Sequence, residues 1–302
     1  MKKPNFFIIG APKCGTTSLA SWLATHPNVY MSPIKEPHFY STDLKSHDLR
    51  RTTYESLFRG ASDAHIAVGE ASVYYLFSRV AVPKIEHEIK NARYIVMVRN
   101  PVEMAYSFHD QHLFGGREHV IDFEEAWRLS PQRREGHMVT HWCPEPRLLD
   151  YQSVCMLGKQ LKRLLGVVPR ERVLVLVLDD VKENPRREYL KVLDFLGVRD
   201  DGRMEFPVRN PAKERRWPWL RRAVVAAGRV SHAIKRNLGL STLQGTGVLN
   251  ALNRRNLHVR ERPPLSPELR AELIEYFQDD IRLLSRLLNR DFSNWLNADV
   301  HG

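Results

Sequence analysis

The sequence predicts one α/β domain with a central parallel sheet and helices on both faces. Three observations predict it. Short, almost wholly apolar runs alternate along the chain with segments of helical periodicity, and turn residues separate the two. The apolar runs lack the alternation of a sheet with one wet face, as expected for strands covered on both sides. The 302 residues suffice for one large core and contain no internal repeat, so we expect a single domain over residues 1–302.

The strands are expected where apolar residues run without interruption. The first run ends in Gly10, and a later run is ended by Asn100 and Pro101, residues that favour turns. A run that alternates valine and leucine has the strongest strand character of all. The predicted strands are residues 5–10, 66–70, 93–99 and 172–178.

The helices are expected after these strands, bounded by residues that suit helix ends. Pro101 stands at the first turn of one helix, where the missing N–H of proline is tolerated. Gly197 suits the C-terminal end of another helix, and Ser266 suits the start of the last one. The predicted helices are residues 16–25, 101–113, 185–196 and 266–289.

Two regions depart from this rhythm, and we predict that both are acceptor-side insertions. Residues 115–146 are polar and carry several His and Trp residues, and residues 203–255 include a strongly basic segment at 215–236. That segment has two interpretations: a lid helix packed on the core, or an amphipathic helix that makes peripheral contact with anionic lipid.

The composition indicates an ordinary globular protein with a preference for anionic partners. Lys and Arg exceed Asp and Glu by 46 to 35, a net charge of +11. Cys14, Cys143 and Cys155 form no CxxC pair and no ligand spacing, so neither a disulfide framework nor a zinc site is expected. No signal peptide and no apolar stretch of about 20 residues is visible, which favours a cytoplasmic location.

The loop from Gly10 to Thr17 joins the first predicted strand to the first helix. Its spacing, G-x-x-x-x-G followed by two hydroxyl residues, is typical of a phosphate-binding loop, in which backbone N–H groups converge on an anion. The lysine of nucleoside triphosphatases would stand where this chain has Thr16, whereas Lys13 lies inside the loop. No acidic strand end follows to hold Mg²⁺. We therefore predict a phosphate site without a metal; the alternative is a plain strand–helix turn.

Two segments resemble the sulfotransferases that use 3′-phosphoadenosine 5′-phosphosulfate (PAPS). Residues 7–19 are similar, nearly residue for residue, to the 5′-phosphosulfate loop of that family. Residues 94–107 resemble its 3′-phosphate element, a strand followed by Arg99 and, eight residues later, Ser107. The resemblance implies a P-loop-type three-layer fold, PAPS as the donor, and a reaction that requires no metal.

The same resemblance implies which residues hold the donor. The loop residues would bind the 5′-phosphosulfate, and Lys13 would also stabilise charge on the departing phosphate. Taken alone, Arg99 and Ser107 could be a strand-end ion pair and a helix-surface serine; as a pair at this spacing they imply a 3′-phosphate site. A basic loop at the place of Arg260 and Arg262 closes over the nucleotide in the family, although a solvated charge run is the alternative here. The implied donor ligands are Lys13, Cys14, Gly15, Thr16, Thr17, Ser18, Arg99, Ser107, Arg260 and Arg262.

Two further segments resemble the glycan-modifying branch, which includes the heparan sulfate sulfotransferases. These are residues 35–39, Lys-Glu-Pro-His-Phe, and residues 69–75, which begin Gly-Glu. In that branch the glutamate is the general base, so the resemblance implies Glu70 as the base and Lys35 as a charge stabiliser. The alternative for Glu70 is a carboxylate that only orients Lys13 and Lys35.

The predicted function is therefore sulfuryl transfer from PAPS to an acceptor hydroxyl or amine on a carbohydrate or glycoconjugate. A lipid or small natural product is the alternative acceptor. A P-loop kinase would need lysine after Gly15, and a nucleic-acid-binding protein would leave the two motifs unexplained, so we expect no nucleic-acid partner. His109 and His112 are interpreted as a polar helix face rather than a metal site, and Cys14 as a small loop residue rather than a reactive thiol.

Overall fold

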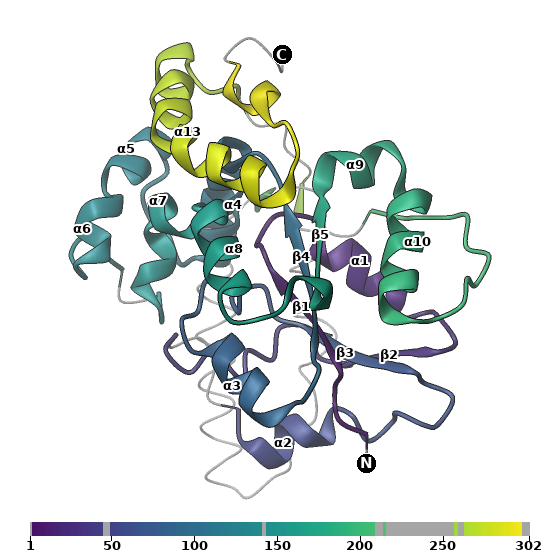
Figure 1. The fold of residues 1–302 in the computed structure, drawn as a ribbon. Helices are drawn as coiled ribbons and strands as arrows, with labels where there is room; N and C mark the ends of the chain where they lie inside the picture. The colour runs from purple at the N-terminus through teal and green to yellow at the C-terminus, as the bar shows by residue number, and fades with distance from the viewer. Residues whose placement is uncertain are drawn as a thin grey trace, which may run out of the picture.

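A computed structural model of the chain shows a three-layer α/β fold (Figure 1). The structure describes residues 2–44, 49–140, 143–208 and 263–297, together with the backbone at 214–215 and 257–258. Residues 216–236 of the predicted basic segment, Arg260 and Arg262 lie outside the described residues.

The centre of the fold is a five-stranded sheet in the order β2-β3-β1-β4-β5, with every neighbouring pair parallel. Four of its strands confirm the predicted runs: β1 (Phe6–Gly10), β3 (Ala67–Ala71), β4 (Arg93–Val98) and β5 (Val173–Val177). The fifth, β2 (Val29–Met31), was not predicted, because three residues are too short to show a period. A separate antiparallel pair joins β6 (Glu214–Arg215) to β7 (Leu257–His258).

The four predicted helices are confirmed within a few residues at each end. They are α1 (Thr16–Leu23), α4 (Pro101–Gly115), α10 (Pro185–Leu196) and α13 (Pro267–Leu288). Asn100 caps α4 by accepting the N–H of Val102 at 2.9 Å, and Ser266 caps α13 by accepting that of Leu269 at 3.2 Å. Within the described residues the other α-helices are α2 (Arg51–Ser56), α3 (Ala81–Glu88), α5 (Phe123–Arg128), α6 (Ser130–Arg134), α7 (Tyr151–Val154), α8 (Leu157–Leu165) and α9 (Leu178–Glu183).

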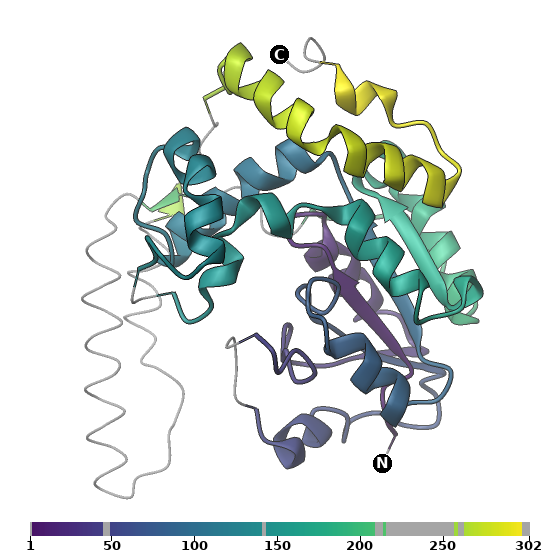
Figure 2. The same cartoon turned by 60° about the vertical axis from the view of Figure 1, so that its left-hand side comes forward.

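Helices cover both faces of the sheet, as the continuous apolar strands predicted. Figure 1 shows α1 and α10 on one side and α3 and α8 on the other. In Figure 2, α13 lies across α4 and α8, both of which it contacts. Every residue of β1 is buried, so the core is centred on this strand.

The region predicted as the first insertion, 115–146, contains α5 and α6. It is attached to the core by buried side chains rather than standing apart. Trp127 is buried and donates from Nε1 to Glu272 of α13 at 3.0 Å, and the enclosed guanidinium of Arg133 pairs with the enclosed carboxylate of Glu118 at 2.6 Å. The division of the chain into one domain with two insertions stays a prediction.

Candidate active site

The loop between β1 and α1 presents a helix N-terminus to an open cleft. Gly15 begins the helix at φ +89°, a conformation that favours glycine, and a Cβ there would stand 2.8 Å from the side chain of Leu178. The first turn of α1 carries no acidic residue, and no side chain caps it. The positive end of the helix dipole is therefore uncompensated where the loop meets the cleft, which is the arrangement that favours an anion.

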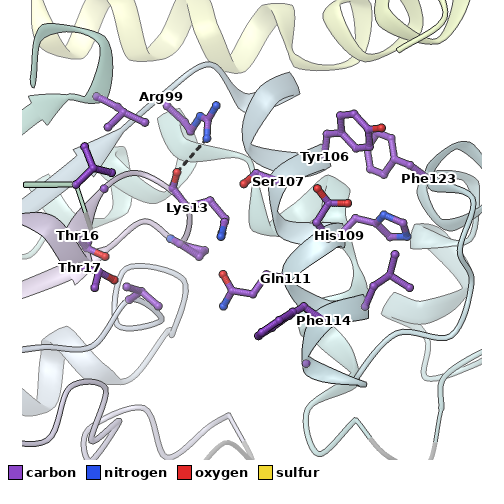
Figure 3. Close-up of a pocket in the computed structure, with 18 of the residues that line it drawn as sticks. Lys13, Thr16, Thr17, Arg99, Tyr106, Ser107, His109, Gln111, Phe114 and Phe123 are labelled. Carbon is purple, nitrogen blue, oxygen red and sulfur yellow. Dashed lines mark hydrogen bonds between the residues drawn. The ribbon is translucent and has the colours of Figure 1, made fainter. Parts of the chain in front are cut away.

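The cleft has a volume of about 1420 Å³ and opens at the carboxyl ends of the strands. Residues that follow β1, β4 and β5 all line it: Lys13, Arg99 and Leu178. Figure 3 shows Lys13, Arg99 and Ser107 around one end of this space. Among the residues implied as donor ligands, those that line the described cleft are Lys13, Gly15, Thr16, Thr17, Ser18, Arg99 and Ser107.

Arg99 links the two implied phosphate elements directly. Its Nη1 donates to the backbone carbonyl of Lys13 at 3.1 Å (Figure 3). Ser107 is buried on α4 and lines the same cleft. The direction of α4 is set at its start by Pro101 and the Asn100 cap, so the sequence around Arg99 determines where Ser107 stands. Two motifs more than eighty residues apart thus meet in one cationic, hydroxyl-bearing surface.

Cys14 is turned away from this surface. Its thiol donates to the carbonyl of Pro12 at 3.4 Å and lies 3.9 Å from the sulfur of Met104, and its side chain is fully buried. Burial raises the pKa of Cys14 to about 12. The thiol is therefore protonated and enclosed, so only the backbone of Cys14 can face the cleft.

Glu70 is enclosed at the end of β3. Its carboxylate accepts hydrogen bonds from Ser72 at 2.7 Å, Tyr75 at 2.7 Å and Tyr54 at 3.3 Å, and the residue has 0% exposure. Burial raises the pKa of Glu70 to about 7, although the three hydroxyl donors act in the opposite direction. Glu70 does not belong to the lining of the described cleft. Its role as general base stays a prediction.

Glu36 is one of four carboxylates that line the cleft, together with Asp110, Asp122 and Glu124, and sequence reasoning missed it. Its Oε1 is paired with the ammonium of Lys35, and its Oε2 lies 3.6 Å from Nε2 of His38. Burial acts to raise the pKa of Glu36, but the hydrogen bond with His38 and the charge of Lys35 outweigh it and lower the pKa to about 2. The signal was present in the sequence, because Glu36 directly follows Lys35 in the same quoted motif.

The far side of the cleft is formed by α4 and the segment that follows it. Tyr106, Phe114 and Phe123 give this wall aromatic surface (Figure 3), and Arg117 and Asp110 add charges of both signs. This wall belongs partly to the region predicted as an acceptor-side insertion. The cleft as a whole, at about 1420 Å³, is larger than the roughly 300–1,000 Å³ typical of a site for one drug-sized ligand.

The sulfotransferase domain model matches residues 3–210, which is more than half of the chain. The chain belongs to the sulfotransferase domain family. The family predicted from the two phosphate motifs is therefore confirmed, and so is the P-loop-type fold with a central parallel sheet and helices on both faces.

Similar proteins come from curated sequences and from solved structures. Human carbohydrate sulfotransferase 15 is 27% identical over 268 residues, which covers 71% of this chain and 48% of that protein. Human heparan sulfate glucosamine 3-O-sulfotransferase 3B1 is 29% identical over 196 residues, covering 65% and 46%. The chain thus spans about half the length of these curated relatives. The crystal structure of a sulfotransferase from Alicyclobacillus acidocaldarius matches with a TM-score of 0.71 and 28% identity, covering 98% of this chain and 100% of that chain.

His109 and His112, the two histidines weighed as a metal pair, both lie on α4. His109 hydrogen bonds to the carbonyl of Val120 at 2.9 Å, and burial lowers the pKa of both His109 and His112. The described part of the chain holds no group of three or more potential metal ligands. Within the same part, no helix combines the length and apolar character needed to span a bilayer. The cytoplasmic location stays a prediction.

Proposed function

We propose that the protein transfers a sulfuryl group from PAPS to a hydroxyl or amine of a sugar acceptor, with Glu36 as the general base. The observation that carries this proposal is the meeting of two anion-binding elements in one cleft. The open N-terminus of α1 with Lys13 forms one element, and Arg99 with Ser107 forms the other. A nucleotide with phosphate groups at both the 5′ and 3′ positions requires two such elements.

The residues present fit this donor. Loop amides, Thr16, Thr17 and Ser18 supply donors for the 5′-phosphosulfate, and the guanidinium of Arg99 offers a planar fork for a phosphate. The first turn of α1 has no carboxylate that would repel the anion. PAPS supplies the sulfuryl group and a phosphate leaving group. Lys13 neutralises charge that develops on the bridging oxygen as that bond breaks, the electrostatic role of a cation placed before the reaction begins.

The base is assigned to Glu36 rather than Glu70 because access comes before pKa in choosing a general base. Glu36 reaches the cleft, whereas Glu70 is fully enclosed by side-chain hydroxyls. The low pKa of Glu36 keeps it ionised in the resting protein. A hydroxyl oxygen that is bonding to sulfur becomes strongly acidic, so a weakly basic carboxylate suffices to accept its proton. We assign Lys35 the role of holding the charged form of Glu36.

The step balances without a metal or a redox partner. The acceptor oxygen attacks sulfur, and the new S–O bond forms as the bond between sulfur and the bridging phosphate oxygen breaks. The electron pair of the broken bond stays with the phosphate, beside Lys13. The proton of the acceptor passes to Glu36. The products are a sulfate ester, adenosine 3′,5′-diphosphate and one proton.

A sugar acceptor is supported by the names of two relatives, a carbohydrate and a heparan sulfate glucosamine sulfotransferase. It is also supported by the room in the cleft and by aromatic side chains such as Tyr106 and Phe114, since aromatic faces pack well against the apolar faces of sugar rings. A lipid or small natural product is the alternative acceptor, favoured by the same apolar wall.

Binding of adenosine 3′,5′-diphosphate, titrated by calorimetry with EDTA present, tests the donor site. We expect saturable one-to-one binding without Mg²⁺, weakened in an Arg99→Ala variant and unchanged in Lys90→Ala, which removes an exposed lysine. Labelled PAPS incubated with a panel of glycans, glycolipids and phenols then identifies the acceptor. Absence of nucleotide binding to the wild-type protein would overturn the proposed function, and turnover only with lipids or phenols would overturn the sugar acceptor.

A further inference from the structure

The segment that carries Glu36 is held to the chain after β3 by alternate backbone N–H groups. The N–H of Glu36 donates to the carbonyl of Ala71 at 2.8 Å. The N–H of His38 donates to the hydroxyl of Ser72 at 3.0 Å, and the N–H of Tyr40 donates to the hydroxyl of Tyr75 at 3.2 Å. The last two bonds end on hydroxyl groups rather than on backbone carbonyls. Their strength therefore depends on the group to which each hydroxyl donates its own hydrogen bond.

Both hydroxyls donate hydrogen bonds to the carboxylate of Glu70. Ser72 donates to Oε2 at 2.7 Å and Tyr75 donates to Oε1 at 2.7 Å. Each hydroxyl therefore accepts from the loop and donates to the carboxylate, which makes two relays with a common end. Hydrogen bonds in such a chain polarise and strengthen one another, and a charged acceptor strengthens them further. Glu70 is the group that sets the direction of both relays.

The segment needs this support because its backbone is strained. Glu36 has φ +64° and His38 has φ +51°, a region that residues with a side chain rarely adopt. Such conformations persist only when the surroundings impose them. A third hydroxyl reinforces the same place: Tyr54 donates to Glu70 at 3.3 Å while its ring stacks on Phe39, with centroids 4.2 Å apart.

We propose that Glu70 is a positioning residue, which acts through Ser72 and Tyr75 to hold residues 36–40 so that the carboxylate of Glu36 faces the cleft. This inference rests on the proposed function, in which Glu36 is the base. It requires Glu70 to be ionised, because a protonated carboxyl would present its own O–H to a hydroxyl that must donate, and one relay would have to reverse.

Burial makes Glu70 a group that titrates near neutral pH. The charged and titratable groups that face it are Lys35, Tyr40, Tyr54 and Tyr75. Burial raises the pKa of all three tyrosines above their ordinary value, so they stay neutral when the pH passes through about 7, where Glu70 itself titrates. Activity should therefore fall as the pH is lowered through this value.

Amide hydrogen exchange at His38 and Tyr40 tests the relays without any acceptor. We expect Glu70→Gln to accelerate exchange at both amides by up to about tenfold, because the hydroxyls of Ser72 and Tyr75 lose the charged acceptor that strengthens their bonds. Ser72→Ala should accelerate His38 alone, and Tyr75→Phe should accelerate Tyr40 alone. Amides of β1 report whether each variant remains folded. Unchanged exchange at His38 in Glu70→Gln, or in Ser72→Ala if the former does not fold, would overturn the proposal.

Turnover with PAPS and the best acceptor from the glycan, glycolipid and phenol panel tests positioning against a purely structural role. Glu70→Gln should lower kcat by about 10- to 100-fold, leave the Kd for adenosine 3′,5′-diphosphate unchanged, and abolish the loss of activity near pH 7. Adding Ser72→Ala to Glu70→Gln should cost little more. Wild-type kcat with an unchanged pH profile would overturn the proposal. If Glu70→Gln abolishes turnover while Glu36→Gln keeps it, the base assignment fails as well.

Discussion

Glu36 and Glu70 lie in two segments that pack against each other, and their surroundings differ in almost every respect. Glu36 lies on the cleft, its side chain 33% exposed, with Lys35 and His38 beside it. Glu70 is enclosed and receives hydrogen bonds from three neutral hydroxyl groups. Cationic partners stabilise the charged form of a carboxylate, whereas burial disfavours it. A near-neutral pKa and access to the cleft therefore belong to two different glutamates, Glu70 and Glu36.

Replacing each carboxylate separately tests whether the two have different roles, and Glu36→Gln should have the largest effect on turnover. The amide cannot accept the proton of the acceptor, so we expect kcat to fall by about 10²- to 10⁴-fold. The Kd for adenosine 3′,5′-diphosphate should stay unchanged, because no donor phosphate needs this group. Turnover of PAPS with the best panel acceptor and nucleotide calorimetry measure the two quantities.

The matched control is Glu171→Gln, which removes an exposed carboxylate before β5. It should leave kcat and nucleotide binding at their wild-type values. If Glu36→Gln keeps kcat within about threefold of the wild type, Glu36 is not the base. If it loses nucleotide binding as well, the variant has disturbed the donor end of the cleft instead.

Substitutions at the end of the cleft that holds Lys13, Arg99 and Ser107 should change nucleotide binding, whereas substitutions of the two carboxylates should change turnover. We expect Arg99→Ala to weaken the binding of adenosine 3′,5′-diphosphate by about 10- to 100-fold, since a charge-assisted hydrogen bond is lost together with the bond to Lys13. Ser107→Ala removes one neutral donor and should cost about 2- to 10-fold. Calorimetry measures both. Equal losses for the two variants would contradict the assignment of the arginine as the main phosphate ligand.

The fold and the meeting of Lys13, Arg99 and Ser107 in one cleft could be predicted from the sequence because their signals are local. The loop at 10–17 is one continuous motif, and Arg99 and Ser107 share one strand–helix unit whose geometry follows from Pro101. The choice between Glu36 and Glu70 could not be made in that way. It depends on the path of residues 32–40, which strand pairing, positive φ angles and hydroxyl relays impose together.

The orientation of individual side chains could not be predicted from the sequence either. Cys14 lies within the phosphate loop, but its thiol faces the core, and that outcome depends on the position of Met104 on a distant helix. The strand β2 escaped prediction because it is formed by pairing with β3 rather than by its own pattern. In each case the deciding contacts join segments far apart in the chain, which a reading of local sequence does not contain.

Thermal stability should show the clearest difference in sign between the two carboxylates. The pKa of Glu70 is raised from 4.5 to about 7 in the folded protein, so below about pH 4.5 its buried carboxyl is neutral in both states. As the pH rises toward 7 the unfolded chain releases this proton first, and the free energy of unfolding falls. Glu36 behaves oppositely, because a pKa lowered to about 2 contributes stability above pH 4.5 that is lost as the pH falls toward 2.

We therefore expect Tm of the wild type relative to Glu70→Gln to decrease by about 10 °C as the pH rises from about 4.5 to about 7, because a pKa raised from 4.5 to about 7 corresponds to about 3 kcal/mol, at about 2–4 °C per kcal/mol. Relative to Glu36→Gln, Tm of the wild type should decrease only as the pH falls below about 4.5. Differential scanning fluorimetry across this range, with Glu171→Gln as the control, measures both. Lowering the pH through 7 should then make the wild type more stable while it becomes less active. A Tm difference for Glu70→Gln that stays flat over this window would show that burial does not perturb this carboxylate. Opposite trends in stability and turnover would mean that the fold favours the neutral form of Glu70 while the positioning of Glu36 depends on the charged one.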